Sequence, residues 1–186
     1  ATMFRENQIP IPRELAGLML GAILSDTLIF QSPTTTKKDI DTANILAALA
    51  DLDIDQFGRE MFSASAANMN QSIHEMIVQD IKYYDISGCS SMISQCMVAS
   101  INDVKGREKE IQEAIDRLVK QKGLDLLVVA FTSIADEGSI FFSAGEKGEK
   151  CQEAFPDHSE GGHDLQKGIF SRKSQILPAL TRAISE

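Results

Sequence analysis

The hydrophobic pattern of the first third of the chain predicts helices. The block from Leu15 to Leu24 is apolar almost all round, which is typical of a helix that is buried on most of its sides. Another helix is expected to begin after Thr36, because Asp39 follows three residues later and the pair can form a capping box. The apolar positions from Ile40 to Leu49 have the spacing of a helix with one buried face.

From about Ile73 onward, apolar runs with strand character alternate with helical patterns. The segments expected are a helix over 73–82, a strand over 92–101, a helix over 103–123, strands over 124–132 and 140–142, and a helix over 149–155. The last segment, 169–185, is expected to begin as a strand and to end as a helix. The predicted fold class is therefore α/β, with a mixed β-sheet flanked by helices.

Between Phe57 and Ser72 the composition shifts to small and polar residues, which is typical of a connection between domains. A helical connection is the alternative, because alanines tolerate a helix. The domain boundaries predicted from this shift are residues 1–64, a linker over 65–72, and a second domain over 73–186.

The net charge of the chain limits the classes of molecule that it is expected to bind. Eighteen Lys and Arg residues stand against 27 Asp and Glu residues, a net charge of −9. An acidic chain is unsuited to general nucleic-acid binding, which needs a basic face to displace counterions from phosphates. A small anionic ligand remains compatible, because a few cations that converge in a cleft create a local positive field. We therefore expect no nucleic-acid partner.

Cysteine usage and hydropathy both indicate a cytoplasmic protein without a membrane partner. The three cysteines, Cys89, Cys96 and Cys151, are odd in number and lack a C-x-x-C spacing. They fit a reducing compartment in which thiols serve as small apolar side chains. No apolar run approaches the roughly 20 residues that are needed to span a bilayer.

Asp26 is the ionisable residue between the apolar block and the apolar run from Leu28 to Phe30. A buried carboxylate without a partner costs several kcal/mol, so a metal ion or another cation is one expectation. The alternative is that Asp26 caps a short turn that follows it, since Asp is a favoured N-cap residue. Spacing alone leaves both interpretations open.

Arg172 and Lys173 are adjacent cations in a mostly apolar context. They are either a solvated pair near the start of a helix or a site for an anion, because an Arg fork matches phosphate oxygens and Lys adds a point charge. As exposed cations they are expected to contribute about 1 kcal/mol or less to folding. The histidines, His74, His158 and His163, are isolated in the sequence, and His158 and His163 lie in a polar, Gly-containing loop where they are expected to be exposed.

Two motifs resemble a known family. The segment 17–30, followed by Ser32-Pro33-Thr34, resembles the metal-ligand segment of family II inorganic pyrophosphatases, which are manganese-dependent enzymes of the DHH phosphoesterase superfamily. The sequence Ser-Arg-Lys-x-Gln-Ile-Leu-Pro over 171–178 is similar to the C-terminal signature of these enzymes, which belongs to a domain called DHHA2. The resemblance implies that residues 1–64 are the C-terminal part of a DHH catalytic domain and that 73–186 form a substrate-binding DHHA2 domain.

The resemblance also implies roles for four residues. Asp26 would be a metal ligand and catalytic residue, and Arg172 and Lys173 would hold phosphate oxygens. Lys82, in Asp80-Ile81-Lys82, takes the place of a substrate-binding Lys that family members carry in an Asp-Ala-Lys-like segment. A solvated Lys at the end of a helix is the alternative for Lys82, because it would complement the helix dipole.

The function implied by this resemblance is hydrolysis of pyrophosphate to two phosphates in the cleft between the DHH and DHHA2 domains. The implied cofactor is Mn²⁺, with Co²⁺ or Mg²⁺ as alternatives, and a metal-activated hydroxide would attack phosphorus. The implied substrate is pyrophosphate or a short polyphosphate, and the parent protein would be a homodimer. Two alternatives stay open: an exopolyphosphatase of the same superfamily, and a phosphate-binding module without turnover.

The sequence departs from the family pattern at two points. Gln31 stands where many members have a Lys between the Phe and the Ser-Pro-Thr of the first motif. The Asp-His-His motif and the earlier histidine and aspartate ligands are absent from the chain. We therefore expect a C-terminal fragment that carries only part of the catalytic site and is inactive by itself, because one carboxylate does not hold two divalent ions.

Overall fold

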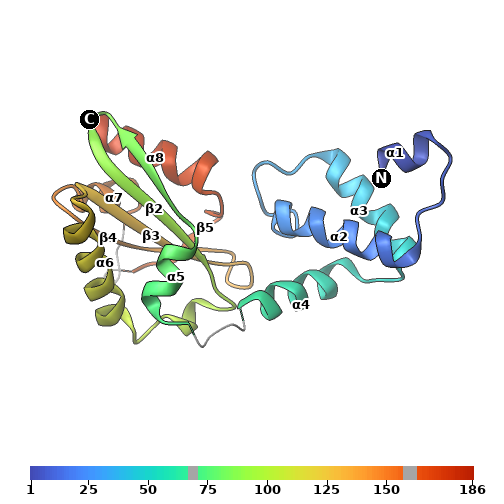
Figure 1. Ribbon diagram of the computed structural model, residues 1–186, viewed down its shortest axis with the longest axis horizontal. Coiled ribbons are helices and arrows are strands. Elements are labelled where there is room, and N and C mark those ends of the chain that lie inside the picture. The colour runs from blue at the N-terminus through green and yellow to red at the C-terminus, as the bar shows by residue number, and fades with distance from the viewer. Residues whose placement is uncertain (67–70, 157–162) are drawn as a thin grey trace. The chain divides into compact units, whose positions relative to one another are not determined.

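The computed structural model describes residues 1–66, 71–156 and 163–186, and the chain divides into two compact units, Ala1–Ala67 and Asn68–Glu186. The first unit is helical and the second is built around a β-sheet (Figure 1). The predicted α/β class with a mixed sheet flanked by helices is confirmed. In the described part of the chain, no helix is both long enough and apolar enough to cross a membrane.

The helices of the first unit are α1 (Thr2–Glu6), α2 (Arg13–Thr27), α3 (Lys37–Ala50) and α4 (Ile54–Ala66). Helix α2 packs on α3 through a common core that includes Leu20, Leu24 and Leu46. The capping box at the start of α3 is present: the Asp39 carboxylate accepts the Thr36 N–H at 2.9 Å, and the Thr36 hydroxyl accepts the Asp39 N–H at 3.3 Å. Helix α4 continues through the small-residue stretch as far as Ala66.

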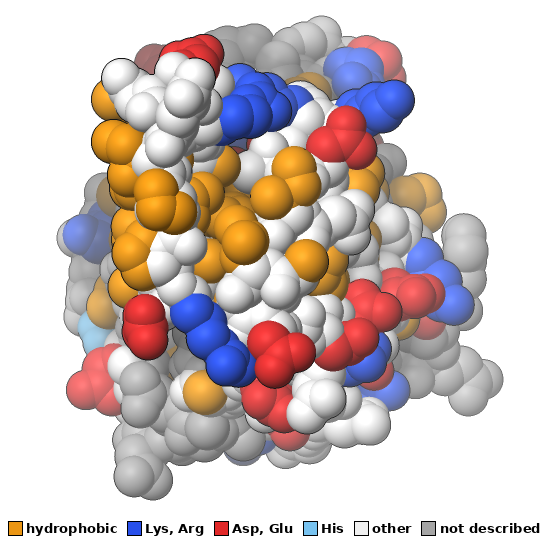
Figure 2. Space-filling view, turned by 90° about the vertical axis from the view of Figure 1, so that its right-hand side faces the viewer, with side chains coloured by type: hydrophobic (Ala, Val, Ile, Leu, Met, Phe, Trp, Pro, Cys, Tyr) orange, Lys and Arg blue, Asp and Glu red, His pale blue; other side chains and the backbone are white. Residues whose placement is uncertain are grey.

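Part of the apolar surface of the first unit is exposed, and α2 is buried along one side only. Leu18, in the middle of α2, is 73% exposed, whereas Leu20 and Leu24 are fully buried. Figure 2 shows hydrophobic side chains gathered on one part of the molecular surface. The large hydrophobic side chains of this unit that are exposed are Met3, Ile9, Leu18, Ile40, Ile45, Leu49 and Leu52.

The second unit contains a five-stranded sheet in the order β1-β2-β3-β4-β5. The strands are β1 (Ile81–Ile86), β2 (Cys89–Met97), β3 (Leu126–Ser133), β4 (Gly138–Ala144) and β5 (Gln166–Lys167). The pair β2 and β3 is parallel and the other neighbouring pairs are antiparallel. A parallel pair needs a crossover, and α6 (Glu108–Lys122) lies within that connection after a short 3₁₀ turn, η1 (Ile101–Asp103).

Helices cover both faces of this sheet. One face packs against α5 (Ile73–Gln79) and α6, with Phe131 and Phe142 in the core. The other face packs against α7 (Glu149–Ala154), a π-helical turn η2 (Arg172–Ile176) and α8 (Leu177–Ser185). Every residue of β3 is buried, as a strand covered on both faces requires.

Two expectations for the second unit were wrong. The helix expected over 73–82 ends at Gln79, and Lys82 lies in strand β1. Pairing with β2 decides this, because Ile81, Tyr83 and Tyr84 favour strands and every residue of 81–84, Lys82 included, has a partner in the ladder. The strand expected at the start of 169–185 is also absent: the backbone passes from the short strand β5 into the π-helical turn at Arg172.

Candidate functional site

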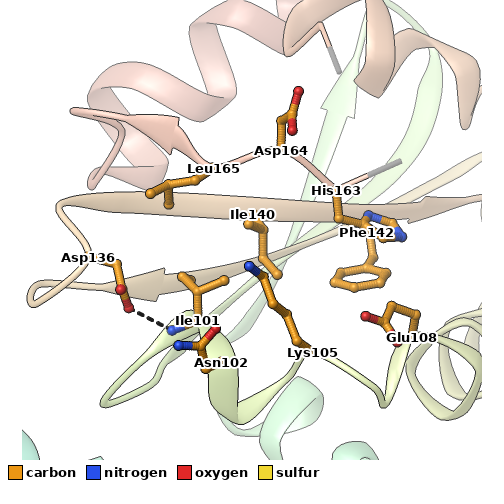
Figure 3. A pocket seen from close by; sticks show the side chains of 10 residues that line it. All are labelled: Ile101, Asn102, Lys105, Glu108, Asp136, Ile140, Phe142, His163, Asp164 and Leu165. Atoms are coloured by element: carbon orange, nitrogen blue, oxygen red, sulfur yellow. Dashed lines mark hydrogen bonds between the residues drawn. The ribbon is translucent and has the colours of Figure 1, made fainter. Parts of the chain in front are cut away.

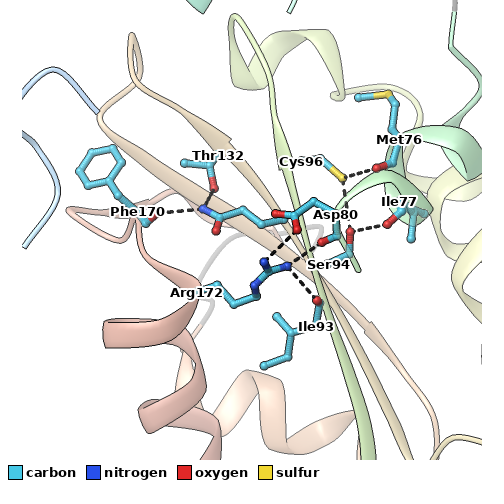
Figure 4. Close-up of polar contacts among 10 residues, drawn as sticks. Met76, Ile77, Asp80, Ile93, Ser94, Cys96, Thr132, Phe170 and Arg172 are labelled. Atoms are coloured by element: carbon cyan, nitrogen blue, oxygen red, sulfur yellow. Dashed lines mark hydrogen bonds and ion pairs between the residues drawn. The ribbon is translucent and has the colours of Figure 1, made fainter. Parts of the chain in front are cut away.

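Arg172 begins the turn η2, and its side chain is buried against the edge of the sheet, with 9% of its surface exposed. Its Nη1 donates to the Asp80 carbonyl oxygen at 2.6 Å and to the Ile93 carbonyl oxygen at 3.3 Å (Figure 4). Its Nη2 donates to Asp80 Oδ1 at 2.9 Å. The expectation of an exposed Arg172 was wrong, because the guanidinium is held between strands β1 and β2.

A network of buried polar side chains places the segment that precedes Arg172. Gln95 Nε2 donates to the Phe170 carbonyl oxygen at 2.8 Å and to Thr132 Oγ1 at 3.0 Å. Thr132 Oγ1 lies 2.8 Å from Ser139 Oγ, which donates to the Ile169 carbonyl oxygen at 2.7 Å. One residue each from β2, β3 and β4 therefore fixes the backbone before η2.

The side chain of Gln175 also holds the backbone segment 168–171, which precedes Arg172. Its Oε1 accepts the N–H groups of Phe170 and Ser171, both at 3.0 Å, and its Nε2 donates to the Gly168 carbonyl oxygen at 2.7 Å. The Gln of the C-terminal signature thus orders the backbone next to Arg172. Sequence reasoning did not assign a role to Gln175, although the signature contained it.

Asp80 was missed as a site residue, since it was taken to lie inside a helix. It is the residue between α5 and β1, and its carboxylate is half exposed whereas its partner Arg172 is buried. The two residues are 92 positions apart in the sequence. A sequence signal was available in Asp80-Ile81-Lys82, but only the folded structure shows that Asp80 pairs with Arg172.

Lys82 lies near Arg172 on the same face of the sheet. It pairs with Ile93 across β1 and β2, and directly opposite residues point to the same face of a sheet. That face carries Ile93 in the core beneath α8 and η2. Lys82 and Lys173 are both exposed, and neither forms an ion pair with a residue in the described part of the chain. The structure therefore brings the three predicted cations to one side of the second unit.

Asp26 lies in the last turn of α2 and is exposed. The interpretation as an N-cap is wrong, because α2 continues to Thr27, and the expected burial is wrong as well. A carboxylate in the last turn faces the negative end of the helix dipole, an unfavourable position that a bound cation would relieve.

The backbone directly after Asp26 is strained. Leu28, Ile29 and Phe30 have φ values of 51°, 51° and 64°, a left-handed conformation that costs an L-residue about 1–2 kcal/mol each. The side-chain oxygens Gln31 Oε1 and Thr35 Oγ1 are buried without a hydrogen-bond partner. Strain and unsatisfied groups of this kind concentrate at functional segments.

A family model of the DHHA2 domain matches residues 59–183 of the chain, which include α5, the whole sheet and Arg172. The chain belongs to the DHHA2 family. The predicted recognition of this family is confirmed. The match begins at residue 59, inside α4.

The relatives of this DHHA2 protein carry related names. A probable manganese-dependent inorganic pyrophosphatase of Bacillus velezensis is 38% identical over 184 residues, which are 99% of this chain and 60% of that protein. The manganese-dependent inorganic pyrophosphatase of Bacillus subtilis is 37% identical over 184 residues, again 60% of its length. A solved Methanococcus jannaschii protein, described as a putative family II inorganic pyrophosphatase, has a TM-score of 0.78 and 35% identity. The similarity covers 95% of this chain and 57% of that one, so this chain spans about 60% of the length of the relatives.

The described residues of the DHHA2 protein do not assemble a metal centre. Among them, no group of three or more His, Cys, Asp and Glu side chains could hold a metal ion. His74 is exposed, and His158 lies outside the described residues. His163 is half-buried, contrary to expectation: its Nδ1 is 2.8 Å from the Phe141 carbonyl oxygen, and its ring stacks on Phe142 at 3.8 Å. Asp26 is therefore not part of a complete metal site among the described residues.

The DHHA2 unit also has a pocket of about 500 Å³ on the face of the sheet opposite Arg172 (Figure 3). Its lining residues are Ile101, Asn102, Lys105, Glu108, Asp136, Ile140, Phe142, His163, Asp164 and Leu165. Carboxylates outnumber cations here, which disfavours a phosphate group. We therefore take Arg172, and not this pocket, as the candidate anion site.

Proposed function

We propose that this chain supplies the phosphate-binding side of an inorganic pyrophosphatase that hydrolyses pyrophosphate to two phosphates. The observation that carries the proposal is the gathering of Lys82, Arg172 and Lys173 at one side of a sheet in an otherwise acidic chain. The names of the relatives supply the reaction. A binding site for a phosphoanhydride needs several cations that lie close together, since the substrate carries several negative charges.

The proposed roles follow from the side chains. Arg172 offers a fork of N–H donors that matches phosphate oxygens, and it is fixed in position by Asp80 and by the network of Gln95. Lys82 and Lys173 add mobile positive charges that stabilise the charge developing on the leaving phosphate.

Asp26 is proposed as a catalytic residue and ligand of Mn²⁺, with Co²⁺ or Mg²⁺ as alternatives. The Asp26 carboxylate would help to hold the ion, which when bound would supply Lewis-acid chemistry for activating water and neutralising phosphoryl oxygens. The remaining ligands would come from the part of the enzyme that this chain does not span.

We also propose a domain organisation for the chain. Residues 1–64 would form the C-terminal part of a DHH catalytic domain, 65–72 a linker, and 73–186 the substrate-binding domain. We further propose that the full-length protein is a cytoplasmic homodimer. Size-exclusion chromatography with light scattering on the full-length protein tests the dimer, which a monomeric mass would contradict.

The test of the function is release of phosphate by the full-length protein with Mn²⁺, measured for pyrophosphate and for tripolyphosphate. We expect turnover of pyrophosphate and much slower turnover of tripolyphosphate. The variant Lys173→Ala should lower kcat/KM, whereas the control Lys120→Ala, which removes an exposed charge from the distant helix α6, should not. Equal loss in both variants, or preference for tripolyphosphate, would contradict the proposal.

A separate measurement concerns the 186-residue chain by itself. Isothermal titration with pyrophosphate should detect binding that Arg172→Ala abolishes, while an assay with Mn²⁺ should detect no steady release of phosphate. Turnover by this chain alone, after contaminating enzyme has been excluded, would show that it holds a complete catalytic site and would overturn the assignment of a partial one.

A further inference from the structure

We propose that Asp80 is a positioning residue for the phosphate site: it fixes the guanidinium of Arg172 so that one edge stays available for the substrate. This inference rests on the proposed function, because it assumes that Arg172 binds phosphate. It goes beyond that function because it assigns a role to an acidic residue at an anion site, where its own charge repels the ligand.

The hydrogen bonds of Arg172 account for one edge of the guanidinium. Nη1 and Nη2 both point at Asp80, to the carbonyl oxygen at 2.6 Å and to Oδ1 at 2.9 Å. The second N–H of Nη1 is directed to the Ile93 carbonyl oxygen at 3.3 Å. A guanidinium has five N–H groups, so three are engaged and two remain.

The two remaining N–H groups lie next to each other. They are the N–H of Nε and one N–H of Nη2, which form the side-on edge of the guanidinium. In the described part of the chain Nε has no hydrogen-bond partner, and it is not among the buried unpaired atoms, which are Gln31 Oε1 and Thr35 Oγ1. Nε therefore keeps some solvent contact although only 9% of the Arg172 side chain is exposed, and two parallel N–H groups on this edge would match two oxygens of one phosphate.

Asp80 is itself anchored, so it can serve as a fixed reference. Its carbonyl oxygen also accepts the Gln95 N–H at 3.3 Å, which ties it to β2 as well as to Arg172. Its carboxylate is 51% exposed, and an ion pair with one exposed partner contributes little to folding. The Asp80 carboxylate thus adds little to stability but makes a well-defined hydrogen bond. We infer that its role is to orient the guanidinium of Arg172.

Whether replacing Asp80 weakens or strengthens pyrophosphate binding distinguishes an orienting role from a purely electrostatic one. Removing the negative charge of Asp80 would strengthen the binding of an anion if charge were the only effect. Removing the acceptor frees Nη2, and the guanidinium can then turn about its remaining contacts at Nη1. Misplacing a contact group by about 1 Å costs up to about 100-fold in rate, so loss of orientation should prevail.

The first experiment observes the Nε–H resonance of Arg172 by ¹⁵N NMR on this chain, assigned by its loss in Arg172→Lys. We expect Asp80→Ala to speed exchange of this proton with water about tenfold, since local opening controls exchange. Asp80→Asn, whose Oδ1 still accepts a hydrogen bond, should stay near wild type. The control Asp116→Ala removes an equal charge from α6 and should change nothing. Unchanged exchange in Asp80→Ala would overturn the inference.

A titration of the wild-type chain with pyrophosphate needs no variant. The Nε–H resonance should shift, while the protons of Nη1 should stay hindered because both carbonyl bonds persist. Release of Nη1 on titration would overturn the positioning role, and this result stands even if Asp80→Ala does not fold. A missing shift at Nε–H together with the Asp80 effect above would refute the phosphate role of Arg172 instead, so the two failures are distinguishable.

Kinetics of the full-length enzyme complete the test. We expect Asp80→Ala to lower kcat/KM for pyrophosphate about 10- to 100-fold and Asp80→Asn to stay within about threefold. Equal losses in both variants would indicate that the ion pair with Arg172, and not the hydrogen-bond geometry, matters, and a gain in Asp80→Ala would indicate simple repulsion of the substrate. Either result would overturn the inference.

Discussion

The side-chain amide nitrogen of Gln95 lies 2.8 Å from the carbonyl oxygen of Phe170, and 75 positions separate the two residues. Gln95 belongs to β2, and Phe170 immediately precedes the segment that carries Arg172. A strand residue thus fixes the backbone that presents the proposed phosphate ligand. The same nitrogen also donates to Thr132 Oγ1. Replacing Gln95 by an apolar residue would therefore leave two acceptors, the Phe170 carbonyl oxygen and Thr132 Oγ1, without this donor.

The variant Gln95→Leu should therefore lose both stability and phosphate binding. The expected decrease in the free energy of unfolding is about 1–3 kcal/mol, the cost of buried groups left unsatisfied. Pyrophosphate affinity, measured by titration calorimetry, should fall as the segment before Arg172 loosens.

The matched control for Gln95→Leu is Gln112→Leu. Gln112 lies on α6 and donates to the Ser143 carbonyl oxygen at 3.1 Å, away from the Arg172 segment. This control should lose stability without a change in pyrophosphate affinity. If both variants bind pyrophosphate like the wild type, the Gln95 network does not support the site.

Arg172→Ala and Lys173→Ala should differ in stability although both weaken catalysis. Arg172 is buried and bonded to Asp80, so its loss should cost about 1–3 kcal/mol of unfolding free energy, whereas the exposed Lys173 should cost less than about 1 kcal/mol. In the full-length enzyme each loss of a phosphate contact should lower kcat/KM, by about 2–4 kcal/mol or roughly 30- to 1000-fold for Arg172. Urea denaturation and steady-state kinetics measure the two effects, and catalytic efficiency within about threefold of wild type in both variants would refute the phosphate assignment.

Asp136 should make stability depend on pH below neutrality. Burial tends to raise the pKa of Asp136, but hydrogen bonds, chiefly from the Ile101 N–H at 2.7 Å, outweigh it and hold the pKa below its ordinary value of 3.8. A carboxyl with a depressed native pKa stabilises the fold above its unfolded pKa, and this stabilisation is lost as the pH falls through the native pKa.

Asp136→Asn tests this dependence. The variant should melt at a lower temperature than wild type at pH 7, and the difference should shrink as the pH falls below 3.8 and through the lowered native pKa of Asp136. Melting curves by circular dichroism across this range provide the measurement. A constant difference at all pH values would indicate a steric effect of the substitution.

Cys96 and Cys151 should be unreactive in the folded protein. Burial raises the pKa of Cys96 to about 11 and that of Cys151 to about 12. At pH 8 roughly one thousandth or less of each thiol would be ionised, and the thiolate is the reactive form. Iodoacetamide followed by mass spectrometry should modify both thiols in urea and neither under native conditions. Rapid modification of either thiol in the native protein would contradict their burial in the core.

Local sequence patterns predicted the structure correctly where residues close together in the sequence determine it. Thr36 and Asp39 form the capping box that their spacing predicted, because both partners lie within one turn of the same helix. The run 124–132 contains a buried strand, since a segment whose residues 126–131 are all apolar has no stable place at the surface. The C-terminal motif over 171–178 likewise identified the DHHA2 family from contiguous residues.

Only the tertiary structure decided the surroundings of the charged residues. Lys82 lies in a strand because its segment pairs with β2. Arg172 is buried because Asp80 and Ile93, which are distant in sequence, supply the acceptors for its hydrogen bonds. The sequence by itself identified the DHHA2 family and the candidate side chains, through the kinds of residue in each motif. It did not determine their burial or partners, because the free energy of a buried charge depends on acceptors that only the folded chain brings within hydrogen-bonding distance.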